Sequence, residues 1–241
     1  MSHRDVRVFS DAVGVASAVA SRLEEVIEHD LATKGECHVV LTGGTVGIAL
    51  LRHVAASRKI DWTDVHIWWG DERFVPADSG DRNDGQAWDA LLSRIEIPTE
   101  NIHRIAAADS GETLDSAAAS YAKDLESFFG VDFPHFDVTL LGVGPDAHVA
   151  SLFPHLPGVS DLGHIVIPVR DSPKPPSERV SLTLPSINSS RRVWVVAAGT
   201  DKSDAISAAL GPQSPVDAPV SAVHGVEETV FFLDEAASPQ A

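Results

Sequence analysis

The sequence alternates short, almost wholly apolar segments with longer segments of helical periodicity, and this alternation constrains the fold more than any other feature. Continuous apolar runs such as His38–Thr42 (HVVLT) suit parallel strands that helices cover on both faces. Between such runs, apolar residues recur every three or four positions, as at Val15, Val19 and Leu23. The pattern predicts an α/β fold: a doubly wound, mostly parallel, Rossmann-like sheet with helices on both faces.

The chain reads as one domain spanning residues 1–241, since no internal repeat or convincing linker divides it. With 44% hydrophobic residues it can bury a sizeable core. The predicted strands are 6–9, 38–42, 65–69, 136–141, 164–169, 180–184, 193–198 and 229–233. The predicted helices are 15–31, 48–56, 86–94, 114–129 and 201–210.

The formal net charge of −17 excludes several classes of partner. So acidic a chain repels nucleic-acid phosphates and anionic lipid, so we expect no nucleic acid and no membrane as partner. Cys37 is the single cysteine and has no disulfide partner, which indicates a reducing compartment. The first residues lack the apolar core of a signal peptide. We therefore expect a cytoplasmic protein, taken as a monomer although nothing in the sequence fixes its oligomeric state.

Three predicted strands end in small or charged residues, at Thr42–Thr45 (TGGT), Gly70–Arg73 (GDER) and Gly142–His148 (GVGPDAH). The carboxyl ends of parallel strands meet at one edge of the sheet, and open α/β sheets bind their ligands there. The sequence therefore predicts a ligand site formed by these three loops.

The first loop offers backbone N–H groups and the hydroxyls of Thr42 and Thr45 at the start of a helix. Such a turn, with Gly43 and Gly44 at its centre, suits a phosphate group. A double glycine is also typical of an ordinary strand-to-helix turn, so this loop alone does not decide between the two interpretations.

The second loop places a cation beside two acids. Arg73 is suited to stabilise a developing negative charge, while Asp71 and Glu72 are suited to orient it or to contact hydroxyl groups. The alternative is a cluster of surface ion pairs. Two adjacent acids are also possible metal ligands, but no histidine lies close in sequence to complete a ligand set, so we expect no metal.

In the third loop, Gly142, Gly144 and Ala147 match the spacing of a dinucleotide-binding fingerprint. We reject that interpretation, because the loop follows a middle strand and Pro145 removes an N–H donor, and we expect no cofactor. His148 is either a hydrogen-bonded structural histidine or a general base, and the carboxylate of Asp146 favours the base. No serine lies in a G-x-S-x-G elbow, so a serine nucleophile is not expected.

Taken together, these motifs resemble those of the 6-phosphogluconolactonase family. The resemblance rests on Gly70–Pro76 (GDERFVP), on Gly142–His148 with the following Ser151–Pro154 (SLFP), and on Ser172–Pro176 (SPKPP). Their order and spacing agree with the family from about Val39 to Lys202. The resemblance implies hydrolysis of 6-phosphogluconolactone, a phosphosugar lactone, to 6-phosphogluconate in the oxidative pentose phosphate pathway, without an organic cofactor. It also implies a Rossmann-like fold shared with aminosugar-phosphate isomerases.

By this resemblance His148 is the base that activates water, with Asp146 and Arg73 beside it in the active site. The substrate-binding residues that it implies are Thr42, Gly43, Gly44, Thr45, Asp71, Arg179 and Lys202. Cations are few in the C-terminal half of this acidic chain, so Arg170 and Lys174 are two further candidates for a basic phosphate pocket. Two positions depart from the family pattern: Val46-Gly47 replaces x-Pro after the first loop, and Ala147 replaces glycine. If position 147 has a positive φ, alanine there costs about 1 kcal/mol.

Two other functions stay open. An aminosugar-phosphate isomerase or deaminase shares the Gly-x-Gly-x-Asp-x-His pattern, although the segment Val149–Pro154 and the arginine after the acidic pair favour the lactonase. A non-catalytic sugar-phosphate sensor is the second alternative, but the acidic N-terminal region leaves no room for a DNA-binding segment.

Overall fold

A computed structural model describes residues 4–57, 59–130 and 133–239. Its centre is a six-stranded sheet in the order β1-β9-β8-β5-β2-β3, in which every neighbouring pair is parallel. The strands are β1 (Arg4–Phe9), β2 (Cys37–Leu41), β3 (Val65–Trp69), β5 (Val138–Gly142), β8 (Arg192–Ala197) and β9 (Glu228–Asp234). The predicted doubly wound parallel sheet is confirmed.

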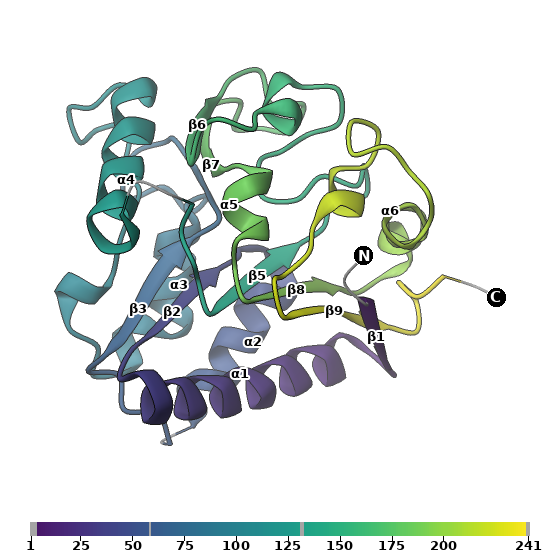
Figure 1. Ribbon diagram of the computed structural model, residues 1–241, viewed down its shortest axis with the longest axis horizontal. Helices are drawn as coiled ribbons and strands as arrows, with labels where there is room; N and C mark the ends of the chain where they lie inside the picture. The colour runs from purple at the N-terminus through teal and green to yellow at the C-terminus, as the bar shows by residue number, and fades with distance from the viewer. Residues whose placement is uncertain (1–3, 58, 131–132, 240–241) are drawn as a thin grey trace.

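Helices cover the sheet on both sides (Figure 1). The α-helices are α1 (Ala12–Lys34), α2 (Gly44–Ala56), α3 (Asn83–Ala90), α4 (Leu114–Phe129), α5 (Leu184–Asn188) and α6 (Ser203–Leu210). Short 3₁₀ turns are η1 (Leu92–Arg94), η2 (Thr99–Asn101), η3 (Pro157–Ser160), η4 (Thr200–Lys202) and η5 (Pro219–Ala222). α1 and α2 pack against each other on one side, while α5 lies on the opposite side of the sheet.

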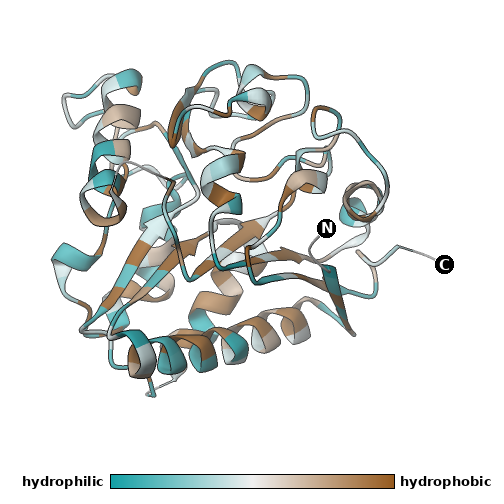
Figure 2. Ribbon diagram, in the orientation of Figure 1, coloured by the Kyte–Doolittle hydropathy of each residue, from teal (hydrophilic) through white to brown (hydrophobic). Residues whose placement is uncertain are grey.

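The helix α1 illustrates why the chain folds this way. Asp11 caps its N-terminus by accepting a hydrogen bond from the amide of Gly14, and Gly35 ends it with φ +86°. Val15, Val19 and Leu23 are buried against the sheet, as their spacing predicts. Figure 2 shows the resulting alternation of hydrophobic and hydrophilic residues along the helix. Among the described residues, no helix is long and apolar enough to cross a membrane.

A second, three-stranded antiparallel sheet corrects part of the sequence prediction. It consists of β4 (Asp71–Arg73), β7 (Arg179–Leu182) and β6 (Val166–Val169), in that order. The segments 164–169 and 180–184 were expected in the main sheet, and Gly70–Arg73 was expected to be a loop. Instead the chain leaves β3 at Gly70 and enters β4 at once, because its residues pair with β7. The small sheet stands over the carboxyl edge of the large one (Figure 1).

Two helix predictions and the end of one strand prediction also change in detail. The predicted helix 86–94 is α3 followed by the separate turn η1, because the chain bends at Leu91. The segment 201–210 begins in η4 and continues as α6. Leu184 was expected to end a strand but begins α5, a helix of five residues with proline in its first turn.

Candidate active site

The strand order reverses between β2 and β5, and a cleft lies beyond the carboxyl ends of these two strands, where open α/β sheets bind ligands. Its volume is about 310 Å³. The residues that line it are Thr42, Gly43, Gly44, Asp71, Arg73, Asn83, Gly142, Val143, Gly144, Pro145, His148, Ala150, Lys174, Pro175, Arg179 and Lys202. The three predicted loops therefore do meet at one edge of the sheet.

His148, which lines this cleft, forms a short hydrogen bond with Asp146. The distance between His148 Nδ1 and Asp146 Oδ1 is 2.6 Å, and Lys174 Nζ donates to the same carboxylate oxygen over 2.9 Å. Partial burial opposes ionisation of Asp146, but the hydrogen bonds from His148 and Lys174 outweigh it and hold the pKa of Asp146 well below its usual range. An ionised Asp146 accepts a hydrogen bond from Nδ1–H of His148, which leaves Nε2 of the neutral imidazole free to act as a base.

The loop after β5 holds His148 by an unusually tight turn. The amide of Gly144 donates to the carbonyl of His148, and the amide of Ala147 donates to that of Gly144, both over 2.9 Å. A Cβ on Gly144 would lie 2.0 Å from His148 Nδ1, so this position has room only for glycine. Ala147 has φ +65°, which meets the condition under which its methyl group strains the backbone. Phe153 supports the imidazole from behind, with the two ring centres 4.5 Å apart.

The glycine turn after β2 leads into the first turn of α2. The N-cap residue of this helix is Gly43, so no N-cap side chain accepts a hydrogen bond from the first amides of the helix. The first amides of a helix lack partners within the helix and favour anions. Beside the turn, Gly43, Gly44, Thr45 and Lys202 line a second hollow of about 330 Å³. This hollow and the cleft share Gly43, Gly44 and Lys202, so they form one continuous surface. Lys202 Nζ lies 3.0 Å from its exposed neighbour Asp201.

Thr42, predicted to bind the substrate, connects the first of the three loops to the third. Its hydroxyl oxygen accepts a hydrogen bond from the amide of Gly142 over 3.1 Å, which joins the end of β2 to the end of β5.

The small antiparallel sheet supplies the facing wall of the cleft. Arg73 donates through Nη1 to the carbonyl of Asp81, while its Nε is buried and has no hydrogen-bond partner among the described residues. Arg179, which pairs with Arg73 across the strands, donates to the carbonyls of Lys174, Pro175 and Pro176. Arg179 thus shapes the proline-rich loop that carries Lys174, and its Nη1 lies 3.9 Å from Asp71 Oδ2.

The two acids of the second loop have different surroundings. Asp71 accepts a hydrogen bond from Ser151 Oγ over 2.6 Å at the cleft wall. Glu72 is 1% exposed and turns away from the cleft, so the interpretation that it contacts hydroxyl groups is wrong. Its carboxylate accepts from the amides of Asn83 and Asp84 and thereby caps α3. Burial raises the pKa of Glu72 to about 7, although the nearby Arg82 and these two amides favour the charged form.

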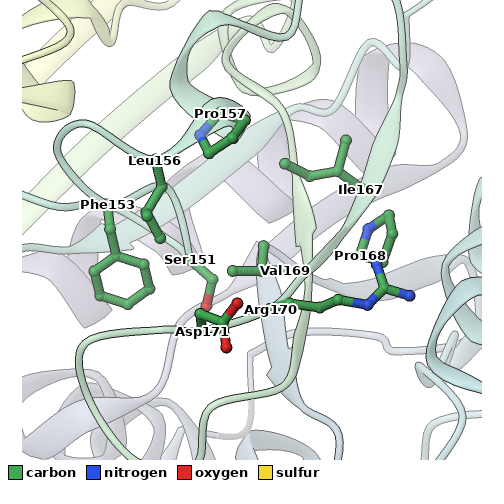
Figure 3. A pocket seen from close by; sticks show the side chains of 10 residues that line it. Ser151, Phe153, Leu156, Pro157, Ile167, Pro168, Val169, Arg170 and Asp171 are labelled. Carbon is green, nitrogen blue, oxygen red and sulfur yellow. The ribbon is translucent and has the colours of Figure 1, made fainter.

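Arg170 lies outside the cleft. Its guanidinium forms an exposed ion pair with Asp115, and the residue lines a neighbouring cavity of about 280 Å³ (Figure 3). Ser151 and Phe153 separate this mainly apolar cavity from the active site, since both line it while Ser151 bonds to Asp71 and Phe153 packs on His148.

Sequence reasoning missed two residues of the site. Lys174 was counted only as a nearby cation, yet it bonds to Asp146; the SPKPP motif was the signal that could have found it. Asn83 lines the cleft, is 3% exposed and was not singled out. Its only signal was a polar residue at the start of a helix, which usually marks an exposed cap.

Among the described residues, one group of acid, histidine or cysteine side chains is close enough together to share a metal ion: Asp30, Cys37 and Asp137. These residues lie at the end of the sheet away from the cleft. Both acids pair with the cations Lys34 and Arg191, so ion pairing accounts for them. In the cleft, Asp71 and Asp146 already accept hydrogen bonds from Ser151, His148 and Lys174. The absence of a metal from the reaction stays a prediction.

The parallel sheet, with a cleft beyond the carboxyl ends of its strands, is typical of α/β proteins that bind small ligands. A family model described as glucosamine-6-phosphate isomerases/6-phosphogluconolactonase matches residues 10–232, and the chain belongs to this family. Within it, the chain is 43% identical over 238 residues to a 6-phosphogluconolactonase of Mycobacterium tuberculosis, covering 97% of this chain and 96% of that one. It is 44% identical to a 6-phosphogluconolactonase of Streptomyces coelicolor, covering 99% of this chain and 92% of that one.

Solved structures agree with this assignment. A crystal structure of 6-phosphogluconolactonase from Thermotoga maritima superposes with a TM-score of 0.85 at 28% identity, covering 97% of this chain and 100% of that one. A monomeric glucosamine-6-phosphate deaminase superposes with a TM-score of 0.80 at 18% identity over 97% of this chain and 98% of that one. The second likeness concerns the fold alone.

Proposed function

We propose that this chain is a lactone hydrolase that opens 6-phosphogluconolactone to 6-phosphogluconate, the second step of the oxidative pentose phosphate pathway. The observation that carries the proposal is that His148, paired with Asp146, lines the same cleft as a glycine turn that begins a helix. A base and an anion-binding helix N-terminus in one cleft suit a substrate that carries both a reactive carbonyl and a phosphate.

In the proposed reaction, Nε2 of His148 takes a proton from water as the oxygen of that water attacks the lactone carbonyl carbon. Asp146 accepts a hydrogen bond from Nδ1 and stabilises the imidazolium that forms. The carbonyl oxygen becomes an oxyanion, and the positively charged guanidinium of Arg73, which lines the cleft, is proposed to stabilise it. Breaking the ring C–O bond then releases a hydroxyl group, which takes its proton from His148. No covalent intermediate is needed, because a lactone is already an activated ester.

The phosphate is proposed to lie against the first amides of α2 and the ammonium group of Lys202. Arg179 contributes positive charge from the facing wall and holds the proline-rich loop in place. The chain as a whole carries a net charge of −17 and repels a dianion. These cations would make the electrostatic potential locally positive where the phosphate binds. Asp71 is then placed to accept a hydrogen bond from a ring hydroxyl.

We also propose that the enzyme acts in the cytoplasm. Its single cysteine, Cys37, is buried and has no intramolecular disulfide partner, which suits a reducing compartment.

A coupled assay tests the main proposal. Purified protein is mixed with freshly made 6-phosphogluconolactone, and 6-phosphogluconate is followed through its NADP-dependent dehydrogenase, with spontaneous hydrolysis subtracted. We expect rapid, protein-dependent formation of product. A rate no greater than the spontaneous one, together with release of ammonia from glucosamine 6-phosphate, would instead establish the deaminase alternative.

A further inference from the structure

The two glycines after β2 are needed for different reasons. Gly44 has φ +83°, in the left-handed region that favours glycine, and a Cβ there would meet no atom within 4 Å. Gly43 has φ −79° and ψ −162°, which any residue can adopt. A Cβ on Gly43, however, would lie 2.1 Å from Oδ1 of Asn83 and 2.9 Å from its Cγ. It is therefore the side chain of Asn83 that requires glycine at position 43.

Asn83 is held firmly in this position. Its amide donates to Glu72 Oε1, and its side-chain Nδ2 donates to the carbonyl of Asp71, both over 2.8 Å. Its Oδ1 is buried and has no hydrogen-bond partner among the described residues. A buried acceptor without a donor destabilises a fold, so its presence in a cleft wall requires an explanation.

We propose that Asn83 is a positioning residue for substrate binding, an inference that rests on the proposed function. Its side chain is anchored to β4 and presses on Gly43. It thereby fixes the glycine turn, and with it the first amides of α2, relative to Asp71 and Arg73 on the facing wall. The contact sets the spacing between the proposed phosphate site and the catalytic residues of the cleft. Because Oδ1 stays behind Gly43, the phosphate meets N–H donors of the turn and not this carbonyl oxygen.

The first experiment replaces Asn83 by alanine and measures affinity without turnover. Binding of 6-phosphogluconate and of inorganic phosphate is titrated by calorimetry. We expect both dissociation constants to rise at least tenfold and KM for the lactone to rise in parallel, while kcat stays within threefold. The matched control is Asn101→Ala, which also removes a buried side-chain bond to a backbone carbonyl, that of Thr63, but does not line the cleft. Unchanged affinities in Asn83→Ala, within twofold, would overturn the proposal.

A double-mutant cycle tests the contact itself. Gly43→Ala alone should weaken phosphate binding severely or prevent folding, because its methyl group collides with Asn83. In Gly43→Ala/Asn83→Ala the collision is gone, so the double variant should bind phosphate at least fivefold better than Gly43→Ala, or fold where the single variant does not. Losses that simply multiply would show that Asn83 and Gly43 act independently and would overturn the proposal. If both variants that carry Gly43→Ala fail to fold, the affinity of Asn83→Ala decides alone.

The design separates this inference from the proposed function. A wild-type protein that binds phosphate but does not open the lactone would contradict the proposed function, and the effect of Asn83→Ala on phosphate affinity would still decide the role of Asn83. A wild-type protein that binds neither 6-phosphogluconate nor phosphate would overturn both.

Discussion

His148 and Asp146 meet through a single 2.6 Å hydrogen bond although only one residue separates them in the chain. Side chains two positions apart ordinarily diverge, and here the tight turn at Gly144 and the positive φ of Ala147 bring them together. The pairing is thus a property of the backbone of this loop.

We expect His148→Asn to lower kcat by about 10²- to 10⁴-fold, the usual worth of a general base. The asparagine keeps a polar side chain beside Asp146, so the protein should stay folded. The coupled assay measures the loss, and thermal unfolding checks the fold. A loss smaller than tenfold would refute the assignment of His148 as the base.

Lys174→Met should impair the reaction through Asp146. One charge-assisted hydrogen bond is worth roughly 1.5–3 kcal/mol, and the partial exposure of Lys174 favours the low end, or about a tenfold loss in kcat. Without the lysine, the pKa of Asp146 rises, so the carboxylate becomes protonated at a higher pH. The loss in kcat relative to the wild type should therefore grow as the pH falls. A loss of the same size at every pH would mean that Lys174 acts in another way. Lys59→Met, on an exposed lysine, is the control.

Lys202 and Arg179 should differ in a comparison of two substrates. Lys202→Ala should lower kcat/KM for 6-phosphogluconolactone roughly 30-fold or more, the cost of truncating a partner of a desolvated ion pair, but leave unphosphorylated gluconolactone unaffected. Arg179→Ala should impair both lactones, because Arg179 also holds three carbonyls of the proline-rich loop. The surface residue Arg170 provides the control, and Arg170→Ala should leave kcat/KM unchanged for both lactones. Equal losses on both lactones in Lys202→Ala would remove that residue from the phosphate site.

Exhaustive chelation should leave the enzyme active. The acids of the cleft accept hydrogen bonds from neighbouring side chains, and the proposed chemistry relies on His148 and Arg73. We expect kcat/KM within twofold of the untreated value after chelation, with metal content measured on the same sample. Activity that is lost and then restored by one divalent ion would overturn the metal-free mechanism.

Acid should destabilise the protein through His38, which lies at the opposite end of β2 from the cleft. Burial, and then the neighbouring His66, lower the pKa of His38 to about 3, below the ordinary value of about 6.5 in the unfolded chain. The folded state therefore binds this proton less well. The stability that the neutral imidazole provides is complete above about pH 6.5 and is lost as the pH falls toward 3.

His38→Asn offers a test, because asparagine keeps an acceptor for the indole N–H of Trp68. We expect the Tm of the variant to fall less steeply than that of the wild type between pH 7 and pH 4. His29→Asn, at an exposed position, should retain the wild-type slope. Parallel curves for His38→Asn and the wild type would contradict this account.

The central sheet and most of the cleft could be predicted from the sequence, because a continuous apolar strand such as β2 or β5 is recognisable from its own few residues. The small sheet could not be assigned in the same way, since the pairing of Asp71–Arg73 with Arg179–Ser181 joins distant short segments. Buried polar side chains were also missed. Nothing in the local pattern around Glu72 or Asn83 distinguishes a buried capping carboxylate or amide from an exposed one.

The parallel pairing of β1 with β9 joins Arg4–Phe9 to Thr229–Asp234. During translation, β1 leaves the ribosome long before its hydrogen-bonding partner exists. At about 5–20 residues per second, the delay is on the order of ten seconds or more. Until then the backbone groups of β1 have no strand to pair with, and the side chains of Val6 and Val8 are exposed even in the finished fold. The β1 edge of the sheet can therefore be completed only after β9 has been made. We expect the docking of β1 onto β9 to be the folding step at which chaperones and misassembly have the most opportunity to act.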